Sequence, residues 1–375
     1  MGALDKLKKI QEKNKSMICL GLDLDPKRMP PDSGKSIKTM FDFALRIIDQ
    51  TSDMVCAYKP NMAFYESRGP EGLSLLRSIV ERMPEDMPVI IDGKRADIGN
   101  TASHYAEALY EKLNATWVTL NPYMGYDSMR PFLEYKDRGV FVLCLTSNTG
   151  SKDFQHLDVG GKPLYRVVAE KVDFWNKDDN CGLVVGATQP EELKDMREVA
   201  RDMPLLIPGV GAQGGSLEKA AVYGTANFKK LAMINVSRSV LYASRDADFA
   251  ERAREELVKL NGVVNALRSG ERTLEDVDAP QREAAEQPQA TPAGPPPDQQ
   301  PPPQQPSAGQ QQSQEPREQR RDDGQRNDGR RDNYGNNRRH NNRPRHQGNR
   351  QNNQNQRNHQ GQQNPQNRGD SSDRH

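Results

Sequence analysis

The amino-acid sequence predicts a (β/α)₈ barrel followed by a low-complexity tail. Short apolar runs recur through the first part of the chain, segments with helical spacing separate them, and the composition changes sharply near residue 275. Eight alternations of strand and helix are typical of a closed parallel barrel, which commonly occupies about 250 residues. We therefore expect a barrel domain over residues 1–272 and a disordered tail, rich in Pro, Gln, Asn and Arg, over residues 273–375.

The eight strand candidates are continuous apolar runs rather than alternating ones. Such runs indicate strands that are buried on both faces, as in a parallel sheet covered by helices. An open, doubly wound sheet is the alternative fold. In chain order, the expected strands cover residues 17–22, 54–58, 88–91, 116–120, 140–145, 182–185, 204–207 and 233–236.

The segments that separate the strands show apolar residues at helical spacing. Residues 1–15 are expected to form a charged amphipathic helix and lack the apolar core of a signal peptide. No stretch approaches the roughly 18 apolar residues of a membrane span, so we expect a soluble, cytoplasmic protein that does not enter a membrane. The clearest helices are expected at residues 37–50, 72–82, 101–113, 190–201 and 247–267.

The cysteines and histidines argue against a metal site. The four cysteines are scattered singly, each in an apolar run, which indicates buried thiols rather than disulfides or zinc ligands. Before the tail there are only two histidines, His104 and His156, and neither belongs to a cluster with the spacing of metal ligands. We therefore expect no metal and no cofactor.

Charged side chains gather where the third expected strand ends, at the edge where barrels carry their chemistry. The two-residue period of a strand places Asp92 and Lys94 on one face, with Asp97 just beyond. Lys59, at the end of the second strand, adds another cation beside Asp92. Neighbouring carboxylates keep a lysine protonated, so Lys94 would act as a general acid. A solvated network of salt bridges at the barrel rim is the alternative interpretation.

Residues 92–101, which read DGKRADIGNT, resemble the D-x-K-x-x-D-I-x-x-T signature of the orotidine 5′-phosphate decarboxylase family. Further segments resemble that family in the same order, so the resemblance spans about residues 16–245. The second to fourth of these segments are similar to a longer-chain bacterial branch of the family, and the tail has no counterpart in the pattern. The segments are 21–23 (GLD), 58–61 (YKPN), 63–66 (AFYE), 121–125 (NPYMG), 146–148 (TSN), 208–215 (PGVGAQGG) and 237–239 (SRS).

The resemblance implies decarboxylation of orotidine 5′-monophosphate to uridine 5′-monophosphate in pyrimidine biosynthesis, without metal or cofactor. Lys94 would protonate C6 of the pyrimidine as carbon dioxide leaves, and Asp92 would face the substrate carboxylate. It also implies a homodimer with shared active sites. The other implied roles are Asp23 and Lys59 on the ribose hydroxyls, Asp97 and Thr101 in the partner's site, Ser147 on the pyrimidine amide, Asn121 and Pro208 as substrate contacts, and Gln213 and Arg238 on the phosphate.

The glycine-rich segment 209–214 formally matches the G-x-G-x-x-G fingerprint of dinucleotide-binding proteins. It follows the seventh strand rather than the first, and no acidic residue lies about 20 residues further on. The segment better suits the phosphate site that barrels form after strands seven and eight. Ser237 stands where many family members have glycine, so we place the phosphate on the Arg238 side chain. The loop over residues 148–162 is expected to act as a lid.

Two other functions stay open at this point. A magnesium-dependent sugar-phosphate decarboxylase of the same superfamily shares the D-x-K-x-x-D pattern. The tail suggests an RNA-binding protein, because from Arg317 onward it contains 14 Arg and no Lys against 7 acidic residues. Weak nucleic-acid binding by this segment and a merely solubilising role are both compatible with its composition.

Overall fold

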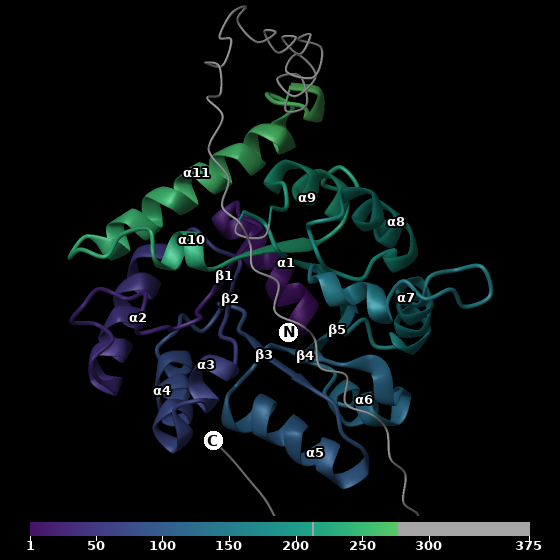
Figure 1. Ribbon diagram of the computed structural model, residues 1–375, viewed down its shortest axis with the longest axis horizontal. Helices are drawn as coiled ribbons and strands as arrows, with labels where there is room; N and C mark the ends of the chain where they lie inside the picture. Colours follow the sequence, from purple (N-terminus) through teal and green to yellow (C-terminus); the bar gives the residue numbers. More distant parts are fainter. Residues whose placement is uncertain (212–213, 277–375) are drawn as a thin grey trace, which may run out of the picture. The chain divides into compact units, whose positions relative to one another are not determined.

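A closed barrel of eight parallel strands forms the centre of the computed structural model, which describes residues 1–211 and 214–276 (Figure 1). Strands run in the order β2-β1-β8-β7-β6-β5-β4-β3, and isolated bridges between Tyr58 and Val89 and between Asn61 and Asp92 join β3 back to β2. The barrel prediction is confirmed, and the open sheet is wrong. The strands are β1 (Ile18–Gly21), β2 (Ala57–Lys59), β3 (Ile90–Arg95), β4 (Trp117–Leu120), β5 (Gly139–Leu145), β6 (Cys181–Val185), β7 (Leu205–Pro208) and β8 (Ala232–Val236).

Helices surround the strands on the outside, as Figure 1 shows. The longer helices bury apolar residues against the barrel and expose most of their charged residues. The helices are α1 (Ala3–Asn14), α2 (Ile37–Thr51), α3 (Ala63–Glu66), α4 (Gly69–Glu81), α5 (Gly99–Glu107), α6 (Tyr126–Leu133), α7 (Leu164–Trp175), α8 (Pro190–Ala200), α9 (Leu217–Gly224), α10 (Arg238–Leu241) and α11 (Phe249–Ser269), with the π-helix η1 (Ala108–Lys112) and the 3₁₀ helices η2 (Pro122–Met124) and η3 (Thr149–Asp153).

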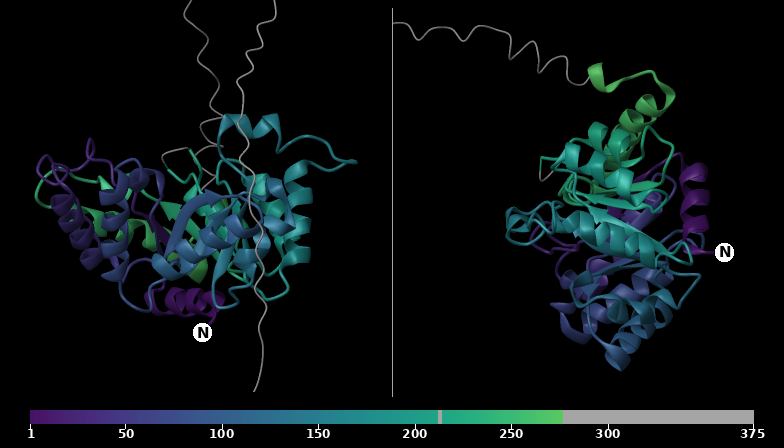
Figure 2. Two further views of the ribbon diagram at one scale, coloured as in Figure 1. Left: turned by 90° about the horizontal axis from the view of Figure 1, so that it is seen from below. Right: turned by 90° about the vertical axis from the view of Figure 1, so that its right-hand side faces the viewer.

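Helix α1 lies across the end of the barrel where the strands begin, as the turned views show (Figure 2). The Gln11 side chain donates to the carbonyl of Ala232, the first residue of β8, at 2.7 Å. This helix therefore covers the end opposite to the carboxyl ends of the strands. The carboxyl ends of the strands, where barrels carry their functional side chains, lie at the other end.

The observed boundaries differ most from the expected ones at the third strand. It was expected to end at Ile91, but β3 continues to Arg95 because its pairing with β4 shifts register between Ile91 and Arg95. Strand β2 begins only at Ala57, since Met54 lies in the turn after α2. Expected helices agree within a few residues.

The cysteine prediction is confirmed, because Cys19, Cys56, Cys144 and Cys181 are all buried and free. Burial raises the pKa of the Cys181 thiol to about 12. No helix in residues 1–211 and 214–276 is long and apolar enough to cross a membrane. The tail predicted from residue 273 lies almost wholly outside the described residues.

Candidate active site

Three of the predicted charged side chains meet at the carboxyl ends of β2 and β3. Lys59 Nζ lies 2.9 Å from Asp92 Oδ2, and Lys94 Nζ lies 2.6 Å from Asp92 Oδ1. The side chains of Lys59 and Asp92 are only 6% and 8% exposed, whereas that of Lys94 is 46% exposed. We call these three residues the charge array. One carboxylate lies between two ammonium groups, and only the Lys94 ammonium is open to a molecule above the barrel.

The electrostatics keep Asp92 and Lys59 ionised at neutral pH. Burial alone would raise the pKa of Asp92, but Lys59 and Lys94 outweigh it and hold that pKa well below its usual range. Burial likewise opposes the charge of Lys59, yet the carboxylates of Asp92 and Asp23 raise its pKa above the ordinary value. Since Lys59 and Asp92 neutralise each other, Lys94 leaves one positive charge in excess.

A bulge in β3 sets the backbone of Lys94. Ile91 pairs with Val118 and Arg95 with Leu120, so β3 advances four residues while β4 advances two. Lys94 has a φ of +46°, a left-handed conformation that costs a non-glycine residue about 1–2 kcal/mol. Simple strand alternation is therefore not the reason why Lys94 meets Asp92. The extra residues of the bulge bring the two side chains together.

Thr119 on β4 contacts two members of the charge array, although the sequence pattern did not point to it. Its hydroxyl donates to Asp92 Oδ1 at 2.8 Å and accepts the backbone N–H of Lys94 at 2.9 Å. One signal could have indicated Thr119. It is a polar residue within the apolar strand β4, two positions before Asn121.

Asp97 does not join the charge array within one chain. Its carboxylate accepts the backbone N–H of Ile98 at 2.8 Å, and among the described residues it takes part in no ion pair. Thr101 is exposed in the first turn of α5. Ile98 between them is 54% exposed, which is high for an isoleucine. The four charged residues expected at this site, Lys59, Asp92, Lys94 and Asp97, thus do not all come together within one chain.

Asp23 lies beyond the end of β1, beside the first residues after β8. The Ser237 hydroxyl lies 2.8 Å from Asp23 Oδ2 and 3.1 Å from the carbonyl of Gly21. A Cβ at Gly21 would lie 2.8 Å from the Ser237 Cβ, so the close approach requires glycine there. Asp23 Oδ1 is buried and has no hydrogen-bond partner among the described residues. Ser237 therefore orients Asp23 and leaves one oxygen of Asp23 to bind a ligand.

Ser147 follows β5 and carries a second unpartnered polar atom. Its Oγ is buried without a hydrogen-bond partner among the described residues, and a Cβ at Gly186 would lie 2.4 Å from it. The side-chain amide of Gln155, from the expected lid, accepts the N–H of Thr146 and donates to its hydroxyl, both at 2.8 Å. Gln155 of this loop thus binds both the backbone and the side chain of Thr146, the residue before Ser147.

The predicted phosphate residues lie after β7 and β8, and the structure describes only some of them. Pro208 is the last residue of β7, and Arg238 is exposed as the first residue of α10. Gln213 lies outside the described residues. The N–H groups of Gly211 and Gly215 donate within the loop, to the carbonyls of Gly215 and Gly209. Those two N–H groups are therefore already satisfied within the loop.

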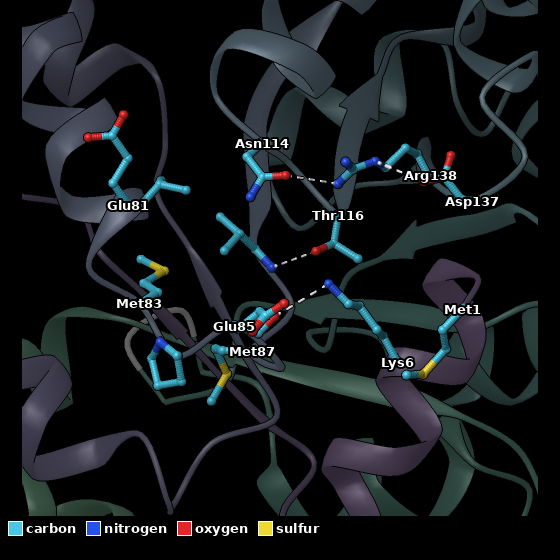
Figure 3. Close-up of a pocket in the computed structure, with 13 residues that line it drawn as sticks. Met1, Lys6, Glu81, Met83, Glu85, Met87, Asn114, Thr116, Asp137 and Arg138 are labelled. Carbon is cyan, nitrogen blue, oxygen red and sulfur yellow. Dashed lines mark hydrogen bonds and ion pairs between the residues drawn. The ribbon is translucent and has the colours of Figure 1, made fainter.

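Asn121 follows β4 and caps η2, since its side-chain oxygen accepts the N–H of Tyr123 at 3.0 Å. It also lines an apolar cavity of about 690 Å³ with Phe154, Tyr165 and Trp175, outside the charge array. A smaller, polar cavity of about 380 Å³ lies at the opposite end of the barrel (Figure 3). None of the predicted site residues lines that second cavity.

No three His, Cys, Asp or Glu side chains come together as a metal site within the described ranges. His104 pairs with Glu107 on the surface, and His156 lies 3.6 Å from Glu192. Burial raises the pKa of Glu192. Lys59 and Lys94 bring two ammonium groups to the charge array, and these groups repel cations rather than bind them.

Comparisons with known proteins agree with this geometry. Residues 16–253 match the model of the orotidine 5′-phosphate decarboxylase / HUMPS family. A relative from Ralstonia pickettii named orotidine 5′-phosphate decarboxylase is 47% identical over 69% of this chain and 96% of its own length. One of the same name from Dehalococcoides mccartyi is 46% identical over 72% of this chain and 99% of its own length. The solved structure of Leishmania donovani OMP decarboxylase is similar, with a TM-score of 0.63 and 38% identity, and the match covers 71% of this chain and 100% of that one.

Proposed function

The chain belongs to the orotidine 5′-phosphate decarboxylase / HUMPS family and decarboxylates orotidine 5′-monophosphate in pyrimidine biosynthesis, and we propose that the charge array delivers the proton. The observation that carries the proposal is the half-exposed ammonium of Lys94, held 2.6 Å from a buried carboxylate. The reaction is that of a carboxy-lyase and yields uridine 5′-monophosphate and carbon dioxide.

Loss of carbon dioxide from this substrate leaves an electron pair on C6 of the pyrimidine, with no electron sink nearby. The bond between C6 and the carboxylate breaks, and the electron pair takes a proton from the Lys94 ammonium. Lys94 then regains a proton from water. A fixed cation at the atom where negative charge develops is the most effective kind of stabilisation for such a step.

Asp92 has two functions in this proposal. It holds the Lys94 ammonium in place at 2.6 Å, and it presents a negative charge to the substrate carboxylate. Because Lys59 binds the other oxygen of Asp92 at 2.9 Å, the carboxylate cannot rotate away. The repulsion is relieved only when carbon dioxide leaves, so Asp92 favours the transition state over the bound substrate.

The remaining predicted residues bind the rest of the nucleotide. We place the ribose hydroxyls on Asp23 and Lys59, and the pyrimidine amide on the Ser147 hydroxyl. Both Asp23 and Ser147 carry a buried oxygen without a partner among the described residues, and a bound substrate would satisfy it. Asn121 and Pro208 contact the substrate, and Gln213 and Arg238 bind the phosphate, whose binding energy closes the loops around the pyrimidine.

In a homodimer, Asp97 of one chain would lie beside the charge array of the other chain. Asp97 lies outside the array of its own chain and is flanked by the exposed Ile98, while Tyr123 is 88% exposed and Phe154 65% exposed near the same end of the barrel. Exposed apolar side chains of this size mark an interface between proteins. We propose that Asp97 and Thr101 enter the partner's site.

Mixing two inactive variants tests this arrangement. If dimers form at random from Lys94→Ala and Asp97→Ala subunits, half are mixed, and each mixed dimer contains one site with native Lys94 and native Asp97, so activity should return to about a quarter of that of the wild type. The control is a mixture of Lys94→Ala with Asp92→Asn, which should stay inactive because these two residues serve one site. No recovery in the first mixture would contradict sharing of the sites.

Turnover should not depend on a metal ion. We expect the wild type to convert orotidine monophosphate at the same rate in EDTA as in magnesium-containing buffer, because an ammonium group supplies the stabilising charge. The decrease in pyrimidine absorbance measures the rate. Activity that EDTA abolishes and Mg²⁺ restores would favour the magnesium-dependent decarboxylase instead.

We propose that the barrel domain catalyses the reaction without help from the tail, and that the protein is cytoplasmic. We also propose that the Arg-rich tail binds single-stranded nucleic acid weakly. Deletion of residues 277–375 should change kcat by less than about twofold, since every proposed catalytic residue precedes the deletion. The full chain should bind a single-stranded RNA oligonucleotide with an affinity that falls as salt rises, and the truncated chain should not. A large loss of turnover on truncation would refute the one-domain organisation.

A further inference from the structure

The hydroxyl of Thr119 contacts both the Asp92 carboxylate and the backbone of Lys94. Thr119 is 1% exposed and belongs to β4, next to the bulge of β3. Its Oγ1 lies 2.8 Å from Asp92 Oδ1 and 2.9 Å from the backbone nitrogen of Lys94. None of the chemistry proposed above uses this hydroxyl.

The direction of these two hydrogen bonds follows from the groups that form them. A backbone N–H can only donate, so the hydroxyl accepts from Lys94. Its own hydrogen is then free to point at Asp92, which is ionised and can only accept. Asp92 Oδ1 therefore accepts from the Thr119 hydroxyl and from Lys94 Nζ, while Oδ2 accepts from Lys59. Hydrogen bonds to an ionised group are the strong kind, and they fix its position.

The backbone of Lys94 needs such support. Its φ of +46° is unfavourable for a side chain with a Cβ, and such a conformation persists only where the surroundings impose it. The regular ladder between β3 and β4 cannot impose it, because pairing is interrupted between Ile91 and Arg95. Within that interruption, the bond from the Lys94 N–H to Thr119 replaces a ladder bond.

We propose that Thr119 is a positioning residue that locks the β3 bulge, so that the Lys94 ammonium and the Asp92 carboxylate keep a fixed geometry toward the substrate. This inference rests on the proposed role of Lys94. Thr119 does not touch the reacting atoms. It acts through the backbone of one catalytic residue and the carboxylate of the other. A misplacement of about 1 Å at such a site is enough to slow a reaction about 100-fold.

The same pair of strands offers a matched control at its other end. Thr116, which precedes β4, is 3% exposed, and its Oγ1 accepts the backbone N–H of Val89 at 3.2 Å, just before β3. Figure 3 shows this bond at the polar cavity, at the end of the barrel away from Lys94. Thr116→Val and Thr119→Val therefore remove the same group from equally buried positions, and each leaves one N–H next to β3 or within it without its acceptor.

The experiment compares kcat, KM and the melting temperature of the full-length wild type and of Thr119→Val, Thr119→Ser and Thr116→Val. We expect Thr119→Val to lower kcat about 10- to 100-fold while KM changes less than about threefold, because ribose and phosphate contacts stay intact. Thr119→Ser keeps the hydroxyl and should remain within about threefold of the wild type. Thr116→Val should lower the melting temperature less than Thr119→Val, because it removes one hydrogen bond rather than two, and should leave kcat unchanged.

A Thr119→Val enzyme as active as Thr116→Val would overturn the inference, as would a Thr119→Ser enzyme as slow as Thr119→Val. If Thr119→Val does not fold, Thr119→Ala against Thr119→Ser decides, since these two differ only in the hydroxyl. A wild type without turnover, or an active Lys94→Ala, would instead refute the proposed function. The two failures are therefore distinguishable.

Discussion

Replacement of Lys94 by alanine is expected to lower kcat on the order of 10⁴-fold or more, the largest effect of any single substitution in this chain. The variant loses the only proton donor of the charge array that is open to the substrate, and it also loses the positive charge that stabilises the developing carbanion. Binding of the product, uridine monophosphate, should persist, because its ribose and phosphate contact other residues. A spectrophotometric assay and a titration with this nucleotide measure the two quantities separately.

Lys136→Ala is a suitable control for the Lys94 experiment. Lys136 is 73% exposed and pairs with Asp178 on the surface, so its loss removes one ammonium without touching the site. The variant should keep the activity of the wild type. Measurable decarboxylation by Lys94→Ala at a rate close to that of the wild type would show that another group protonates C6.

Asp92→Asn should lower both activity and stability. We expect kcat to fall on the order of 10³-fold, because the amide neither holds Lys94 by charge nor repels the substrate carboxylate. The substitution also leaves Lys59 buried beside a neutral group, and removal of one partner of a buried ion pair costs about 3 kcal/mol or more. Denaturant unfolding at pH 7 measures the second effect.

The stability difference between the wild type and Asp92→Asn should depend on pH in one direction. The folded protein depresses the pKa of Asp92, so this carboxylate contributes its full stabilisation above the unfolded pKa of about 3.9 and loses it as the pH falls toward the lower folded value. The difference should therefore be constant from about pH 5.5 to 7 and narrow below about pH 4. A difference that widens in acid would mean that Asp92 is not held as an anion.

Much of the fold followed from local pattern. Strands β6 and β8 are mostly apolar and almost wholly buried. Helix α2 follows its N-cap Ser36, whose side chain accepts the backbone N–H of Thr39. The ends of these elements depend on residues close in sequence, which is why they could be predicted. The meeting of Lys59 with Asp92 also followed, since Lys59 ends β2 and Asp92 lies in the neighbouring strand β3.

Other parts of the site could not be predicted, because they depend on pairing between strands. The bulge that gives Lys94 its left-handed backbone is a mismatch between β3 and β4, and neither strand reveals it alone. Thr119 and Gln155 act through hydrogen bonds to residues on a neighbouring strand or across a loop. Ser237 was noted only as a residue in place of glycine, and the bond of its hydroxyl to Asp23 was not predicted.

The ring of strands is completed between β2 and β3, where only isolated bridges form, and Asp92 supplies most of what joins them. Its N–H donates to the carbonyl of Pro60 at 3.0 Å, its carbonyl accepts from Met62 at 3.1 Å, and its carboxylate binds Lys59. Closure of the cylinder and pairing of Lys59 with Asp92 therefore depend on the same residue. A chain in which β2 and β3 are apart lacks this ion pair and holds only part of the charge array.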